Sequence, residues 1–159
     1  MLITVAAVGK LKAGPERELF ERYLKRAEAS GRTLGLAFGV REFPESRAAA
    51  SDLRKAQEGA SLRGAVPAGA TIVALDEHGK NLTSPEFADR IRAWRDAGQA
   101  NVVLALGGPD GHAAEILAAA GLKIALGAMT WPHQLARIML AEQLYRAVTI
   151  LSGHPYHRA

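Results

Sequence analysis

The stretch NVVLALGGPDG, from Asn101 to Gly111, constrains the fold more than any other part of the chain. Five of its first six residues are apolar, and such a run is typical of a strand buried on both faces of a sheet. Three glycines, a proline and an aspartate follow within five residues, which predicts a tight turn whose backbone N–H groups can approach a ligand closely. Strand, glycine turn and helix in this order are typical of the crevice at the carboxyl end of a parallel sheet. On this stretch alone, a plain strand-to-helix turn explains the pattern equally well.

Strands and helices alternate along the whole chain. Apolar, β-prone runs predict strands at 2–8, 34–43, 70–75, 101–106 and 122–126. Helical spacing of apolar residues predicts helices at 15–31, 46–62, 83–98, 112–120 and 134–152, with a polar turn at 76–80. The fold class is therefore α/β, with a mainly parallel sheet and helices on both faces. No repeat or domain-scale linker interrupts this pattern, so we expect a single domain over residues 1–159.

The composition argues against several classes of protein. With 48% hydrophobic and 23% charged residues, the chain has the balance of an ordinary soluble globular domain. No apolar run reaches the roughly 18 residues of a membrane span, and we see no signal peptide before the first strand. Cysteine is absent, which excludes disulfides, thiolate metal sites and cysteine nucleophiles and agrees with a reducing cytoplasm. The net charge of +4 permits an RNA partner without demonstrating one.

The C-terminal tail is unusually rich in side chains that can do chemistry. His154, Tyr156, His157 and Arg158 lie within five residues of one another. Chain ends are often frayed, but this tail directly follows a helix that we expect to be heavily buried, so its position is restricted. Two imidazoles, a phenol and a guanidinium offer proton acceptors, a stacking ring and a phosphate-binding fork.

Standard catalytic motifs are missing from the sequence. It contains no G-x-S-x-G elbow, no P-loop lysine and no spaced G-x-G-x-x-G. It also lacks H-E-x-x-H, and His154 and His157 are separated by Pro155, so we expect no metal. Asp76 and Asp110 both end strands at the same edge of the predicted sheet, although each taken singly is more typical of a turn residue than of a catalytic carboxylate.

Six segments, taken together, resemble one family over the whole length of the chain. They are the start at Ala6–Lys10, LDEHGK at Leu75–Lys80, LGGPDG at Leu106–Gly111, MTWPHQLAR at Met129–Arg137, AEQLYRA at Ala141–Ala147 and HPYHR at His154–Arg158. Their order and spacing resemble the RlmH family (formerly YbeA) of ribosomal RNA methyltransferases, within the SPOUT superfamily. Asp110 replaces a glutamate that is common in the family, Trp131 a leucine, and Gln134 a proline. Residues 33–65 carry the least resemblance.

The resemblance implies a fold feature, a cofactor and a partner. SPOUT enzymes form a deep C-terminal trefoil knot, a rare exception to unknotted topology, and bind bent S-adenosylmethionine in three loops of the knot. Carried over to this chain, the cofactor-binding residues are Leu75, Leu106, Gly107, Gly108, Leu126, Gly127, Ala128, Met129, Thr130 and Trp131. Family members are homodimers with the knots at the interface, which agrees with the apolar residues on more than one face of the helix at 134–152.

The implied reaction is methylation of N3 of a pseudouridine in large-subunit (23S) ribosomal RNA, on the assembled ribosome in the cytoplasm. The candidate catalytic residues are His157 for proton removal or orientation, Tyr156 for base contact, Arg158 for phosphate or base positioning, and His154 beside them. In a dimer, the tail of one subunit would complete the pocket of the other. Two alternatives stay open: a SPOUT enzyme that acts on a ribose 2′-oxygen or a tRNA base, and a non-catalytic RNA-binding module of the ribosome.

Overall fold

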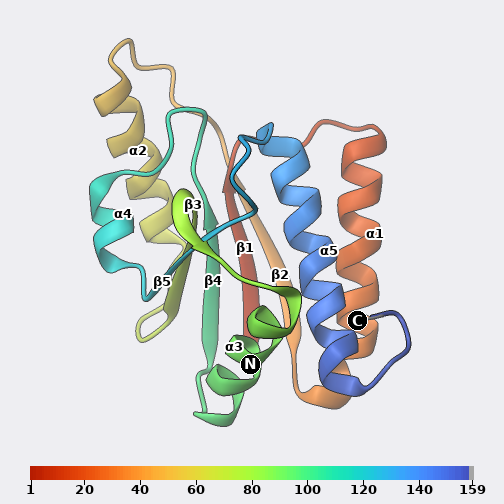
Figure 1. The fold of residues 1–159 in the computed structure, drawn as a ribbon. Helices are drawn as coiled ribbons and strands as arrows, with labels where there is room; N and C mark the ends of the chain where they lie inside the picture. Colours follow the sequence, from red (N-terminus) through yellow and green to blue (C-terminus); the bar gives the residue numbers. More distant parts are fainter. Residues whose placement is uncertain (158–159) are drawn as a thin grey trace.

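The computed structural model describes residues 1–157 and contains one five-stranded sheet (Figure 1). The strands are β1 (Leu2–Val8), β2 (Ala37–Phe43), β3 (Thr71–Asn81), β4 (Asn101–Leu106) and β5 (Leu122–Ala125), in the order β2-β1-β4-β3-β5. The helices are α1 (Pro15–Gly31), α2 (Ser51–Gly64), α3 (Ser84–Asp96), α4 (Ala114–Ala119) and α5 (His133–Ser152), with a short 3-10 turn at Arg32–Leu34. Every strand pair is parallel, so the predicted α/β class with a parallel sheet is confirmed.

Helices cover both faces of the sheet and create two apolar clusters. On one face, Phe20 of α1, Phe87 of α3 and Leu140 of α5 share one buried cluster with Ile3, Val5 and Ala7 of β1. On the other face, Leu62 of α2 and Ile116 of α4 pack against Ala6 and Val8 of the same strand. Alternate residues of β1 therefore enter different clusters, and this explains why the buried strands are continuous apolar runs rather than alternating ones.

Four of the predicted boundaries are wrong. The helix predicted from Ser46 begins at Ser51, because the Ser46 amide donates to Glu58 Oε1 at 2.9 Å and the segment before α2 is held in a non-helical path. The helix predicted at 112–120 covers only Ala114–Ala119. The polar turn predicted at 76–80 is part of β3, which runs on to Asn81, and the strand predicted from Leu34 begins at Ala37.

Strand β3 stops pairing with β5 after Leu75 and pairs with β5 again from Lys80. Residues Val73–Leu75 and then Lys80–Asn81 of β3 both pair with β5, with a register shift between Leu75 and Lys80. This excursion brings the chain that follows Leu75 next to the chain that follows β5. It lies in the region where the family resemblance predicts the trefoil knot. Among residues 1–157, none of the helices combines the length and the apolar character that a membrane crossing needs.

Candidate functional site

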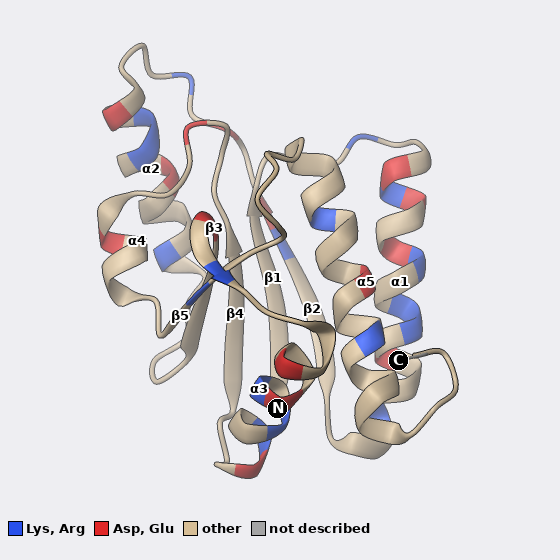
Figure 2. Ribbon diagram, viewed as in Figure 1, with Lys and Arg blue, Asp and Glu red and all other residues tan. Residues whose placement is uncertain are grey.

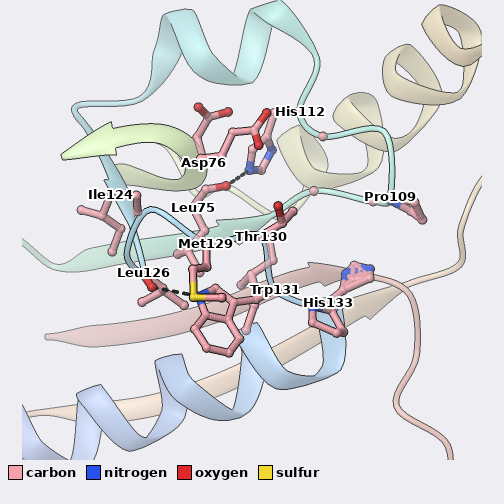
Figure 3. Close-up of a pocket in the computed structure, with 18 of the residues that line it drawn as sticks. Leu75, Asp76, Pro109, His112, Ile124, Leu126, Met129, Thr130, Trp131 and His133 are labelled. Carbon is pink, nitrogen blue, oxygen red and sulfur yellow. Dashed lines mark hydrogen bonds between the residues drawn. The ribbon is translucent and has the colours of Figure 1, made fainter. Parts of the chain in front are cut away.

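A cavity of about 470 Å³ opens at the carboxyl ends of β4 and β5 and beside the middle of β3, where its pairing with β4 ends (Figure 3). One wall is the part of β3 from Leu75 to Glu77, and a second is the glycine turn from Leu106 to His112. A third wall runs from Ile124 to Pro132, and His133 and Ala136 of α5 complete the lining. The three walls come from segments far apart in the sequence, and they meet because parallel strands present their carboxyl ends at one edge.

The structure brings nearly all the residues expected to bind a cofactor to this cavity. Its lining includes Leu75, Leu106, Gly107, Gly108, Leu126, Gly127, Met129, Thr130 and Trp131, but not Ala128. It also includes residues that the sequence did not single out for cofactor binding, namely Asp76, Glu77, Pro109, Asp110, Gly111, His112, Ile124, Ala125, Pro132, His133 and Ala136. The predicted tight turn is confirmed, since the Gly111 N–H donates to the Gly108 carbonyl at 2.9 Å around Pro109 and Asp110.

Glycine is required at two positions of this turn for different reasons. Gly111 has φ +83°, a left-handed conformation that side chains rarely adopt. At Gly107, a Cβ atom would lie 2.9 Å from the carbonyl carbon of Gly111, so the obstacle there is backbone that cannot swing away. The turn therefore presents bare backbone to the cavity.

His112 ties the glycine turn to the middle of β3. The residue is 7% exposed, and its Nε2 lies 2.9 Å from the carbonyl oxygen of Leu75. Burial lowers the pKa of His112, outweighing the Leu75 carbonyl and the Asp76 carboxylate, which favour the charged form. The neutral ring thus donates its Nε2–H to Leu75, while Nδ1 has no hydrogen-bond partner among the described residues. In the sequence His112 looks like an ordinary first residue of a helix, and no local signal marks its role.

The third wall is a closed loop. The Trp131 indole N–H donates to the Leu126 carbonyl at 2.9 Å, and the Gly127 N–H donates to Asn81 Oδ1 at 3.1 Å. His133 follows at the start of α5, and its Nε2 is buried with no partner among the described residues. These contacts leave Met129 74% exposed beside the opening of the cavity. Over residues 1–157, no group of three His, Asp or Glu side chains is arranged to hold a metal ion.

Arg137, from the MTWPHQLAR segment, does not line the cavity and has structural contacts instead. Its side chain is 3% exposed, lies 2.5 Å from Glu42 Oε1 and donates to the carbonyls of Val8 and Gly9. Arg17 pairs with the other oxygen of Glu42 at 3.1 Å. Burial raises the pKa of Glu42, but the Leu11 N–H and the two arginines outweigh it and hold the pKa below its usual range. The carboxylate thus joins α1, β2 and α5 beside the loop that follows β1.

The C-terminal tail folds back onto α5, away from the cavity. The Tyr156 hydroxyl donates to Glu142 Oε1 at 3.1 Å, and its ring centroid lies 4.5 Å from that of Tyr145, with the guanidinium of Arg146 over its face at 5.2 Å. Burial, followed by the Glu142 carboxylate, raises the pKa of Tyr156 to about 12. The His154 N–H donates to the Thr149 carbonyl.

Within one chain, the tail and the cavity are therefore separate. His154, Tyr156 and His157 are absent from the described lining of the cavity, and Arg158 lies outside the described residues. His157 Nδ1 is buried with no partner among the residues that the structure describes. The sequence placed both groups of residues in one function, but one copy of the described chain does not bring them together.

Comparisons with known proteins agree on one family. A family model described as "Predicted SPOUT methyltransferase" matches residues 1–157. A protein of Brucella anthropi is 55% identical over the full length of both chains, and one of Chelativorans sp. is 57% identical over 98% of this chain and 90% of its own. A protein of Nitrobacter hamburgensis is 52% identical over 99% of each. All three carry the name "Ribosomal RNA large subunit methyltransferase H".

Proposed function

Because this chain belongs to the SPOUT methyltransferase family, we propose that it transfers a methyl group from S-adenosylmethionine to N3 of a pseudouridine in large-subunit ribosomal RNA. The observation that carries the proposal is the cavity beside the middle of β3 and the carboxyl ends of β4 and β5, whose lining combines glycines, apolar side chains and a smaller number of polar ones. The printed name of the relatives supports the choice of large-subunit ribosomal RNA as substrate.

The residues present fit a bent adenosine cofactor. A volume of about 470 Å³ lies within the range of small-molecule sites, and Leu75, Ile124 and Trp131 provide apolar surface for a base. The segments Leu106–Gly108 and Leu126–Trp131 would hold the cofactor largely through backbone groups. S-adenosylmethionine supplies an electrophilic methyl group on a positively charged sulfur. The chain's own contribution is to hold acceptor and donor in line, which can supply much of the rate acceleration.

The position of the tail supports a composite site built by two copies of the chain. Helix α5 has 20 residues and is therefore about 30 Å long, with the cavity at its first turn and the tail beyond its last. A homodimer in which the tail of one copy reaches the cavity of the other resolves this separation. It would also cover Met129, Trp131 and Leu135, which are 74%, 39% and 44% exposed beside the cavity, and whose exposure marks an interaction surface. Light scattering at micromolar concentration should give the mass of two chains, and the mass of one would contradict the dimer.

Within that composite site, the tail residues would act on the target base. The N3–H of the base must lose its proton for the nitrogen to attack, and a positioned proton acceptor accelerates such a step. We assign proton removal or orientation to His157, contact with the base to Tyr156, and positioning of phosphate or base to Arg158, with His154 supporting the turn of the tail. Tyr156 is a poor candidate for the proton acceptor, because a pKa of about 12 keeps its phenol protonated at neutral pH.

Charge contributes only modestly to substrate binding in this proposal. Figure 2 shows Lys and Arg on α1, α2, α3 and α5 with Asp and Glu among them, rather than one basic face. A net charge of +4 fits docking onto a shaped surface, such as the assembled ribosome in the cytoplasm, better than gripping free RNA by charge alone.

The deciding experiment incubates the protein and labelled S-adenosylmethionine with ribosomes, with separate subunits and with free ribosomal RNA, and locates the methyl group by mass spectrometry. We expect label on N3 of one pseudouridine of the large-subunit RNA. Label on a ribose or on tRNA would favour a SPOUT enzyme of another specificity. No label, together with no heat on titration with S-adenosylmethionine, would favour a non-catalytic RNA-binding module.

A further inference from the structure

We propose that helix α2 positions the glycine turn of the cofactor cavity, through an ion pair from Arg54 to Asp110 and through the buried carboxylate of Glu58. The inference rests on the proposed function, since it treats the cavity as a cofactor site. It assigns a role to the part of the chain in which the family resemblance is weakest.

Arg54 reaches across 56 residues of sequence to hold the tip of the turn. Its Nε donates to Asp110 Oδ2 at 2.6 Å and its Nη2 to Asp110 Oδ1 at 3.2 Å, the two-pronged geometry that makes arginine–carboxylate pairs strong and directional. Its Nη1 donates to the carbonyls of Ala48 and Ala49 at 3.0 and 2.8 Å. A single guanidinium therefore joins the segment before α2, the helix itself and the glycine turn, and both charged side chains are 29% exposed.

Glu58 supports the same turn from behind, one helical turn further along α2. It is 4% exposed, and its Oε1 accepts from the Ser46 N–H at 2.9 Å. Its Oε2 lies so close to Gly108 that a Cβ atom at that position would overlap it, and it has no hydrogen-bond partner among the described residues. The carboxylate thus limits how far Gly108 can retreat from the cavity.

The neighbouring residue shows how closely α2 lies against the chain after the turn. A Cβ atom on Gly59 would lie 2.7 Å from the Cβ of Ala113, which precedes α4. Arg54, Glu58 and Gly59 contact three successive parts of one wall, from Gly108 through Asp110 to Ala113. The contact is therefore continuous rather than a single surface ion pair.

The turn depends on this support because it has little side-chain packing of its own. Three of its five residues are glycines, which leave more backbone freedom to be lost on ligand binding than other residues do. A wall held in its bound shape binds more tightly than one that must be ordered on binding. Loss of the Arg54–Asp110 pair should therefore weaken cofactor binding, while α2 stays anchored to the sheet by Leu62.

The experiment measures the affinity of the full chain for S-adenosylhomocysteine by calorimetry, alongside thermal unfolding. We expect R54A and D110A each to bind about tenfold more weakly, and the double variant no more weakly than either single one, because two partners of one interaction are not additive. R54K keeps the positive charge but cannot make the two-pronged contact with Asp110, and its affinity should lie between those of wild type and R54A. R63A is the matched control: Arg63 lies in the last turn of the same helix, more than two helical turns beyond Arg54, and is not among the charges that lower the pKa of Asp110.

Variants of Glu58 provide an independent test in the same binding experiment. E58A opens space behind Gly108 and should weaken binding, whereas E58Q has the same shape, keeps an oxygen for the Ser46 N–H and should bind nearly as wild type does. A wild-type chain that binds while R54A, R54K, D110A and E58A bind within twofold of it overturns the inference. Additive losses in R54A/D110A, or equal losses in R63A, also overturn it, since either would indicate general destabilisation. A wild-type chain that does not bind at all rejects the proposed function instead.

Discussion

A Cβ atom on Gly79 would lie 2.5 Å from the carbonyl carbon of Ile124, so the second half of β3 rests directly on the backbone of β5. G79A must push these two segments apart, because neither obstacle is a side chain that can rotate away. Overpacking of this kind costs about 1–3 kcal/mol and occasionally more, and we expect the free energy of unfolding in urea to fall by at least that range. G64A is the control, because a Cβ at the end of α2 meets nothing within 4 Å. Equal stability of G79A and G64A would contradict the close approach.

The second prediction concerns Glu42 and its buried partner Arg137. E42Q leaves the guanidinium, 3% exposed, without its counter-charge, and breaking a buried pair costs about 3–5 kcal/mol. The pKa of Glu42 is lowered in the folded chain, so its contribution is complete above the ordinary carboxyl range and is lost as the pH falls through the folded pKa. Urea unfolding should therefore show that E42Q has a lower free energy of unfolding than wild type at neutral pH, and that this difference becomes smaller in acid. A difference in the free energy of unfolding that does not change with pH would contradict the lowered pKa of Glu42.

The third prediction concerns Tyr156 and the stability of the chain at alkaline pH. Its pKa of about 12, against an ordinary 10.0, means that stability should fall as the pH rises from 10 towards 12, because the folded chain resists the ionisation that the unfolded chain undergoes. Ultraviolet titration of the phenols should show one group with a raised midpoint in wild type, and that group should be missing in Y156F. The variant also loses the bond to Glu142, which contributes about 1 kcal/mol. A wild-type titration in which no phenol ionises with a raised midpoint would contradict the packing described for the tail.

Deletion of Tyr156–Ala159 distinguishes a role of the tail in methyl transfer from a role in cofactor binding. We expect methyl transfer to be abolished while the dimer and the affinity for S-adenosylhomocysteine are largely preserved, because no described tail residue lines the cavity. Transfer is followed with labelled donor and ribosomes, and affinity by calorimetry. Full activity after the deletion would return the tail to the status of a frayed chain end. Loss of cofactor affinity as well would mean that the tail contributes to the cavity wall itself.

The parts of the fold that were predicted correctly are those whose determinants are local. The run from Asn101 to Leu106 needs only its own apolarity to be recognised as a strand, and the turn after it needs only its glycines and Pro109. The start of α2 was missed because the Ser46 N–H is bonded to Glu58, twelve residues further along the chain, and not to its own helical neighbours. The extension of β3 past Leu75 depends on the backbone of β5, which no local pattern of the segment reveals.

The same distinction applies to the site. The resemblance identified the loops that line the cavity, since these carry the recognisable segments. His112 was missed because its role depends on the Leu75 carbonyl, and Arg54 because its partner Asp110 is on another element. The separation of the tail from the cavity could not be foreseen either, because it depends on how the chain turns after α5 and packs on Tyr145.

The length of α5 has a genetic consequence. If each cavity is completed by the tail beyond the far end of the other copy's α5, an allele with a damaged tail and an allele with a damaged cavity can each be inactive and still compensate for one another. In a cell that expresses both, mixed dimers would contain one cavity in which every wall and tail residue is intact. Such a cell would keep ribosomal methylation that neither allele supports alone, and two alleles damaged in the same region would not.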